Sequence, residues 1–174
     1  MWDRGRITMK VRKGFVTNSS SSSFLIGYND LDILLDEIYD KMGLKRGSVH
    51  NDSVNRFVGE LVQCKMTKRQ LNKYLDNLPN TLLYDFHRFR IQYKGKLLSK
   101  YDYRELKDTN TEVGRFWYQT RLQIAKDIKV KAEKYKKFIF MTISSCDVCV
   151  PTEKDIERDV FAKLSGLLFV EDNH

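Results

Sequence analysis

Apolar residues recur at helical spacing in five stretches of the chain, and each stretch predicts a helix. In the first stretch they repeat every three or four positions, at Leu31, Leu34, Leu35 and Ile38. Asp30 or Asn29 stands before this repeat as the expected N-cap, and Gly43 marks its end. The same spacing predicts four further helices, over about 52–63, 68–77, 111–135 and 151–164. Pro79 and Asn80 are expected to end the third helix.

Strands are predicted where apolar and polar residues alternate, or where a short apolar run is uninterrupted. These stretches are 6–16, Phe24–Tyr28, Leu82–Tyr93, Phe138–Ile143 and Leu167–Val170. The run at 138–143 is apolar almost throughout, which is typical of a strand in the centre of a sheet. Residues 94–96 are expected to form a turn.

The order of these elements indicates an α+β fold, with a mixed α/β arrangement as the alternative. Strands stand near both ends and in the late middle of the chain, and the helices cluster between them. A chain of 174 residues can bury a core of its own. We expect a small sheet covered by helices in a single domain over 24–174, preceded by a basic arm and a serine motif over 1–23.

Composition narrows the class of protein. The hydrophobic content of 41%, with nine Tyr and ten Phe, favours a folded protein over a disordered one. No apolar run approaches the length of a membrane span, and no apolar signal segment follows the N-terminus. Three cysteines, an odd number without a framework, fit a reducing compartment. The sequence therefore predicts a cytoplasmic protein with no membrane partner.

The net charge of +8 favours association with a polyanion, and the surplus is unevenly placed. Residues 30–40 carry five acids and no base, whereas 115–137 carry eight Lys and Arg against two acids. A lysine-rich helix can follow a phosphate backbone without reading bases. Aromatic and basic residues at 84–90 would suit stacking on single-stranded nucleic acid. The candidate nucleic-acid contacts are Arg12, Lys13, Arg88, Arg90, Lys126, Lys129, Lys131, Lys134, Lys136 and Lys137. The alternative is a solvated helix and a core strand.

The most distinctive motif is a serine run with apolar flanks, MKVRKGFVTNSSSSSFLI from Met9 to Ile26. It resembles the opening of a scattered set of uncharacterised small proteins of bacteriophages, archaeal viruses and their prokaryotic hosts. Those proteins open with Met-Lys-x-Arg, continue with Gly-Phe-Val-x-Asn, and then carry serines followed by Phe and an aliphatic pair. The resemblance implies a phage or mobile-element origin, but it implies no activity and transfers no catalytic residue. Members usually begin at the methionine matching Met9, so the residues before it are either a basic extension or the product of an upstream start codon.

The serine run itself leaves three interpretations open. It could be an ordered loop between strands or a flexible tether for the basic arm. It could be a site of covalent modification or processing, at Ser19, Ser20, Ser21, Ser22 and Ser23. It could also form an anion-binding nest reinforced by Arg12 and Lys13.

Cys146 and Cys149 form a CxxC pair between a predicted strand and a predicted helix. A thioredoxin-like redox pair occupies such a position, but the later cis-proline of thioredoxins has no counterpart here. The pair could supply half of a zinc site with Cys64, His87 or His174, although a second CxxC is missing. The simplest interpretation is two small buried residues, with no metal and no cofactor.

Two functions of different classes follow from these features. The first is a phage-type, non-enzymatic protein that contacts nucleic acid through the lysine-rich helix and the basic arm. The second is a factor that inhibits or redirects a host protein through the acidic helix or an aromatic surface; those acids are otherwise a solvated helix face. An enzyme is the third choice, because no acid, base or metal set is recognisable.

Overall fold

The structure is a computed structural model that describes residues 21–47, 52–84, 91–99, 102–144 and 160–173. The fold is α+β, as the sequence predicts, and the predicted strand over 6–16 lies outside the described residues. The chain divides into two compact units. We call the described residues within Met1–Thr67 and Tyr135–His174 the sheet unit, and those within Lys68–Lys134 the helix unit.

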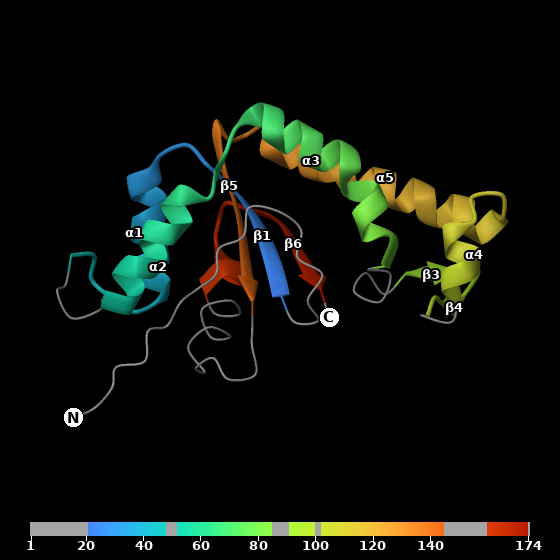
Figure 1. Cartoon of the computed structure of the whole chain (residues 1–174), viewed down its shortest axis with the longest axis horizontal. Coiled ribbons are helices and arrows are strands. Elements are labelled where there is room, and N and C mark those ends of the chain that lie inside the picture. The colour runs from blue at the N-terminus through green and yellow to red at the C-terminus, as the bar shows by residue number, and fades with distance from the viewer. Residues whose placement is uncertain (1–20, 48–51, 85–90, 100–101, 145–159, 174) are drawn as a thin grey trace, which may run out of the picture. The chain divides into compact units, whose positions relative to one another are not determined.

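The sheet unit is built on four antiparallel strands (Figure 1). Their order across the sheet is β2 (Lys65–Met66), β5 (Lys137–Ser144), β1 (Ser21–Tyr28) and β6 (Leu167–Asn173). Strands from opposite ends of the chain are therefore neighbours, since β1 pairs with both β5 and β6. The helix unit is inserted between β2 and β5, which pair with each other. The short strand β2 was not predicted.

One face of this sheet carries the main hydrophobic core. Phe24 and Ile26 of β1 pack against α1 (Leu31–Lys41) and α2 (Asp52–Gln63), both of which the apolar spacing predicted. The ring of Phe161, in the short helix η4 (Phe161–Lys163), lies 5.1 Å from that of Phe24. The predicted helix over 151–164 is described only at its end, because residues 151–159 lie outside the described residues.

A glycine contact joins the end of β1 to the chain that returns from the helix unit. A Cβ on Gly27 would lie 2.4 Å from the Tyr135 ring, so only glycine fits there. A Cβ on Gly166, just before β6, would lie 2.1 Å from the carbonyl oxygen of Gly27, whose backbone amide donates to the carbonyl oxygen of Gly166 at 2.9 Å. The Tyr135 hydroxyl also donates to the carbonyl of Ser165.

The helix unit contains two long helices, α3 (Lys68–Thr81) and α5 (Glu112–Ala132), which lie side by side (Figure 1). The expected end of α3 near residue 77 is wrong, because Pro79 lies inside the helix. The buried Arg121 of α5 donates to the carbonyl oxygen of Pro79, which is one of the last carbonyls of α3. A cation at a helix C-terminus is favourable because the helix dipole is negative there.

The far end of the helix unit has a small second core around Trp117 and Leu106. A hairpin of β3 (Gln92–Tyr93) and β4 (Lys96–Leu97) packs there, together with α4 (Tyr103–Lys107). The predicted turn is confirmed, since Lys94 and Gly95 both adopt positive φ angles. The predicted strand from Leu82 is wrong at its start, where η1 (Leu82–Tyr84) is helical, and residues 85–90 lie outside the described residues. None of the described helices combines the length and apolar character needed to cross a membrane.

Candidate nucleic-acid interface

The two units differ sharply in charge. Residues 68–134 contain sixteen Lys and Arg against eight Asp and Glu, so they carry a net charge of +8. The rest of the chain contains fifteen of each and is neutral. The whole positive surplus of the protein therefore belongs to one compact unit, which is the electrostatic pattern of a polyanion-binding surface.

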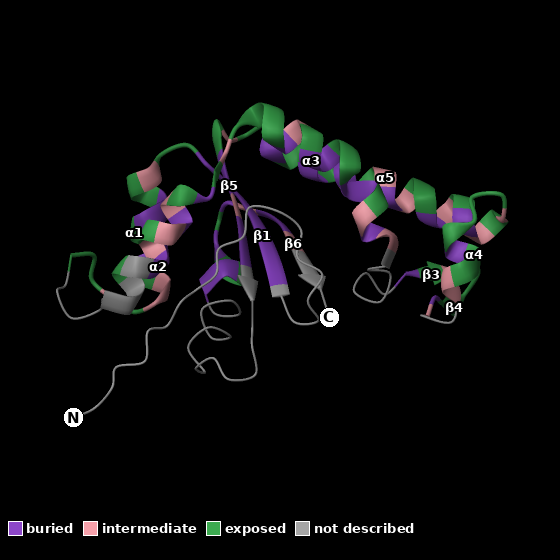
Figure 2. Ribbon diagram, in the orientation of Figure 1, coloured by how far each residue is buried: buried purple, intermediate pink, exposed green. Residues whose placement is uncertain are grey.

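The helix α5 places its lysines on solvent. One stripe of the helix is buried, at Gly114, Trp117, Arg121, Ala125, Ile128 and Ala132. Outside that stripe, Lys126, Lys129 and Lys131 are exposed, and Figure 2 shows buried and exposed segments alternating along the helix pair of α3 and α5. Among the described residues, no carboxylate pairs with any of these three lysines. Their charge is therefore left for solvent or a partner.

At the hairpin end of the helix unit, unlike in the C-terminal half of α5, two lysines pair with carboxylates. Lys94 donates to Glu112 at 2.8 Å, and Lys96 donates to Asp102 at 2.7 Å. The Lys96 ammonium, with the backbone amide of Ser99, lowers the pKa of Asp102 to about 2. Lys94 likewise lowers the pKa of Glu112. Lys94 and Lys96 are therefore neutralised by carboxylates, whereas Lys126, Lys129 and Lys131 of α5 have no described carboxylate beside them.

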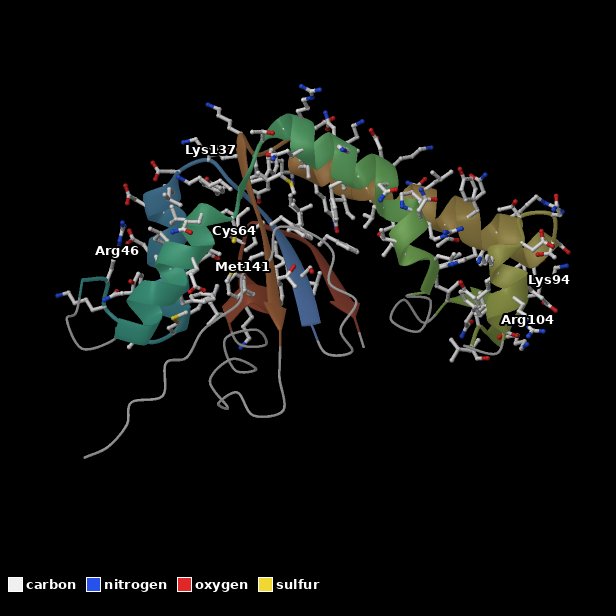
Figure 3. All side chains as sticks on the ribbon, viewed as in Figure 1. Arg46, Cys64, Lys94, Arg104, Lys137 and Met141 are labelled. Atoms are coloured by element: carbon white, nitrogen blue, oxygen red, sulfur yellow. The ribbon has the colours of Figure 1, made fainter. Side chains whose placement is uncertain are left out.

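The predicted lysine helix is too long by one turn. It was expected to run to residue 135, but α5 ends at Ala132, and Lys134 follows the helix as an exposed residue. Lys136 and Lys137 belong to the sheet unit, where Lys137 begins β5 (Figure 3). The helix stops because the next residues make sheet contacts: the backbone amide of Lys136 donates to the Asn29 side chain at 2.9 Å.

The structure does not describe the remaining predicted cations. Arg12, Lys13, Arg88 and Arg90 lie outside the described residues. Sequence reasoning missed exposed cations of the helix unit, among them Arg69 and Lys73 on α3. The available signal was a helix that opens with basic residues and has no acid in its first turn.

The serine run enters the sheet. Ser21, Ser22 and Ser23 are the first residues of β1, so the predicted strand start at Phe24 is too late. Ser22 and Ser23 are buried, and the Ser23 and Thr142 hydroxyls are hydrogen-bonded at 2.9 Å. A loop or tether is therefore wrong for residues 21–23, and the folded sheet shields the hydroxyls of Ser22 and Ser23 from a modifying enzyme. Ser19 and Ser20 lie outside the described residues.

Most carboxylates of the acidic helix α1 form hydrogen bonds or ion pairs within the sheet unit. Asp30 caps the helix by accepting from the backbone amide of Asp32 at 2.8 Å. Arg46 forms ion pairs with Asp32 and Asp36 beside the helix (Figure 3). Hydrogen bonds to Asp32 first, and then to Asp36, raise the pKa of Arg46. Glu37 accepts from the backbone amide and the hydroxyl of Ser165.

The cysteines form no metal centre in the part of the chain that is described. Cys64 is buried in the core beside α2, and its thiol donates to the carbonyl of Glu60 (Figure 3). No group of three or more His, Cys, Asp or Glu among the described residues is arranged to hold a metal ion. Cys146 and Cys149 lie outside those residues, as do His87 and His174.

Comparison with protein-family models, with curated proteins and with solved structures finds no match to this chain.

Proposed function

We propose that this protein binds nucleic acid through the exposed lysines of the C-terminal half of α5. The observation that carries the proposal is the confinement of the whole net charge to the helix unit, with Lys126, Lys129 and Lys131 exposed and not paired to any described carboxylate. The binding is non-enzymatic. Its phage-type origin rests on the resemblance of the Met9–Ile26 motif alone.

The lysines suit phosphate contact better than base recognition. Lysine is a compact point charge, whereas guanine recognition in a groove typically uses the planar fork of arginine. The arginine in the middle of α5, Arg121, is buried and occupied with the carbonyl of Pro79. The proposed contact is therefore electrostatic and insensitive to base sequence.

The alternative of a protein partner for the acidic helix loses support. Three of its carboxylates are held by ion pairs or hydrogen bonds within the sheet unit, at Asp32, Asp36 and Glu37. A basic partner would have to compete with Arg46 for the first two.

A salt titration tests the proposal. Binding of a fluorescent oligonucleotide should weaken linearly on a log–log plot against salt, with a slope of about −3 if three lysines contact phosphates. Polyglutamate of equal charge serves as the competitor control, and it should displace the oligonucleotide poorly. The proposal would be overturned by an affinity that does not change with salt, or by no binding at about 50 mM salt.

A further inference from the structure

An exposed aromatic residue of α5, Tyr118, stands on the same helical stripe as two of the exposed lysines. In chain order the stripe consists of Arg115, Tyr118, Leu122, Lys126 and Lys129, separated by steps of three or four residues. At about 100° per residue, these positions fall within about 80° around the helix axis. Leu122 is half-buried, and the other four residues are exposed. The stripe therefore presents an aromatic ring and basic groups on one side of the helix.

This stripe has no acid between its ends. Asp127 is the one acid in this span of the sequence, but it lies about 180° from Tyr118 around the helix. Its carboxylate accepts from the Gln123 side chain at 2.7 Å. The next acid, Glu133, is the C-cap of α5 and follows Lys129 by four residues. A row of phosphates can therefore follow the stripe without meeting a carboxylate before the end of the helix.

A buried arginine holds the Tyr118 ring in place. The Arg121 guanidinium lies over this ring, 5.5 Å from its centroid, and is itself fixed by its bond to the carbonyl of Pro79. Arg121 is 4% exposed, whereas Tyr118 is 38% exposed, so the cation supports the ring from within and part of the ring meets solvent. A side chain that is already ordered loses little conformational entropy when a ligand stacks on it.

An ordered aromatic ring beside lysines is the combination that binds single strands. The bases of a single strand are free to stack on the ring while the lysines contact the backbone. The bases of a duplex are already paired and stacked on each other, and taking one out costs a few kcal/mol. The ring therefore adds affinity for a single strand and little for a duplex.

We infer that Tyr118 stacks on a base of a single-stranded nucleic acid whose phosphates contact Lys126 and Lys129. This inference rests on the proposed function, and it adds a stacking residue, the supporting role of Arg121 and the class of ligand. Because every base has a flat face, the contact is independent of base sequence.

The experiment uses the full chain, fluorescence anisotropy and two single strands of equal length, one of mixed sequence and one of abasic nucleotides. Both strands carry the same phosphates, but the abasic strand has no base to stack. The original protein should bind the mixed strand about fivefold to a hundredfold more tightly, which is the range for one stacked base. Y118A should lose most of this preference at an unchanged salt slope, because no phosphate contact is removed.

Two further variants serve as controls. Y118F keeps the ring and should keep the preference for the mixed strand. I33A removes an exposed apolar side chain of the sheet unit and should bind both strands as the original protein does. Circular dichroism establishes that each variant folds. If Y118A does not fold, Y118L keeps an apolar side chain beside Arg121 and should lose the preference in the same way.

The outcomes separate this inference from the proposed function. Equal binding of the two strands by the original protein, or an equal loss of affinity for both strands in Y118A, would overturn the inference and leave the proposed function standing. Tighter binding of a duplex of the same length than of the mixed single strand would also overturn the inference. Failure to bind any of these nucleic acids at low salt would overturn the proposed function itself.

Discussion

The sheet unit balances fifteen basic against fifteen acidic residues, whereas the helix unit sets sixteen against eight. In the sheet unit, described charges serve the fold: Asp30 caps a helix, Arg46 bridges two carboxylates and Glu37 holds Ser165. In the helix unit, Lys126, Lys129 and Lys131 make no such contact with described residues. Lys94, Lys96 and Arg121 of the helix unit do serve the fold, so the lysines in the C-terminal half of α5 differ both from the sheet unit and from the hairpin end of their own unit.

This difference has a consequence for mutation. Removing a paired charge, such as Arg46, should act on stability, because its partners Asp32 and Asp36 are left behind. Removing an open lysine of α5 should act on binding alone, since the side chain contacts little in the folded protein. Paired and unpaired charges can therefore be distinguished by which measurement each substitution changes.

The largest effect is expected from K126Q/K129Q/K131Q. Losing three phosphate contacts should reduce nucleic-acid affinity by two to three decades at about 0.1 M salt and lower the salt slope by about 2.7. The melting temperature should stay within a few degrees of the original, because the three side chains are exposed. Anisotropy and thermal unfolding measure the two quantities. K45Q/K65Q/K163Q, with three exposed lysines of the sheet unit, is the matched control. An equal loss of affinity in that control would show that the two units do not differ in their contribution to nucleic-acid binding.

Gly27→Ala should destabilise the sheet unit by about 1–3 kcal/mol, because its Cβ would overlap the Tyr135 ring at 2.4 Å. Urea unfolding measures the loss. Gly59 of α2 is the control, since a Cβ there meets nothing within 4 Å, and Gly59→Ala should stabilise by up to about 1 kcal/mol. In a Tyr135→Ala background the cost of Gly27→Ala should largely disappear. A cost that persists there would mean that the ring contact is not its cause.

Ser23→Ala should cost about 1–2 kcal/mol, because it leaves the buried hydroxyl of Thr142 without the partner at 2.9 Å. Replacing both residues, as S23A/T142V, should cost less than the sum of the two single changes. A double-mutant cycle by chemical denaturation measures the coupling. Strict additivity would show that the hydroxyl pair contributes nothing to the sheet.

The smallest effect is expected from pH. The pKa of Asp102 is lowered from 3.8 to about 2, so folding is favoured by the ionised carboxylate. Its contribution to stability is present above about pH 4 and is lost as pH falls toward 2. NMR titration of the carboxyl carbon should give a midpoint near 2, and D102N should flatten the pH dependence of unfolding in that range. A midpoint near the ordinary value would show that Lys96 does not hold the carboxylate in solution.

Local pattern was enough to predict several elements. The spacing of Leu31, Leu34 and Ile38, with the cap at Asp30, predicted α1 because a helix buries one stripe wherever it packs. The apolar run at 138–143 predicted β5 and its central position, and positive φ at Lys94 and Gly95 confirms the turn between β3 and β4. The lysines of α5 were likewise identified as exposed from their distance to the apolar positions.

The errors arose where a distant contact overrides local preference. A serine run favours a loop by its own chemistry, yet Ser22 and Ser23 enter a central strand because β5 and β6 supply the pairing on both sides. Pro79 lies within α3, and Arg121 from α5 donates a hydrogen bond to the Pro79 carbonyl oxygen, one of the last carbonyls of that helix. Leu82 was assigned to a strand but continues the helical path into η1 as a fully buried residue.

The sequence by itself determined the fold class, most helices and the excess of basic residues, since these depend on spacing and composition. Only the tertiary structure decided how that charge is divided, because a unit boundary at residues 67 and 134 separates Lys131 from Lys136 and Lys137. It also decided that Arg121 of α5 meets the carbonyl of Pro79 in α3, which stands forty-two positions earlier in the chain. Chain folding sets which residues become neighbours, and periodicity within one segment carries no information about that choice.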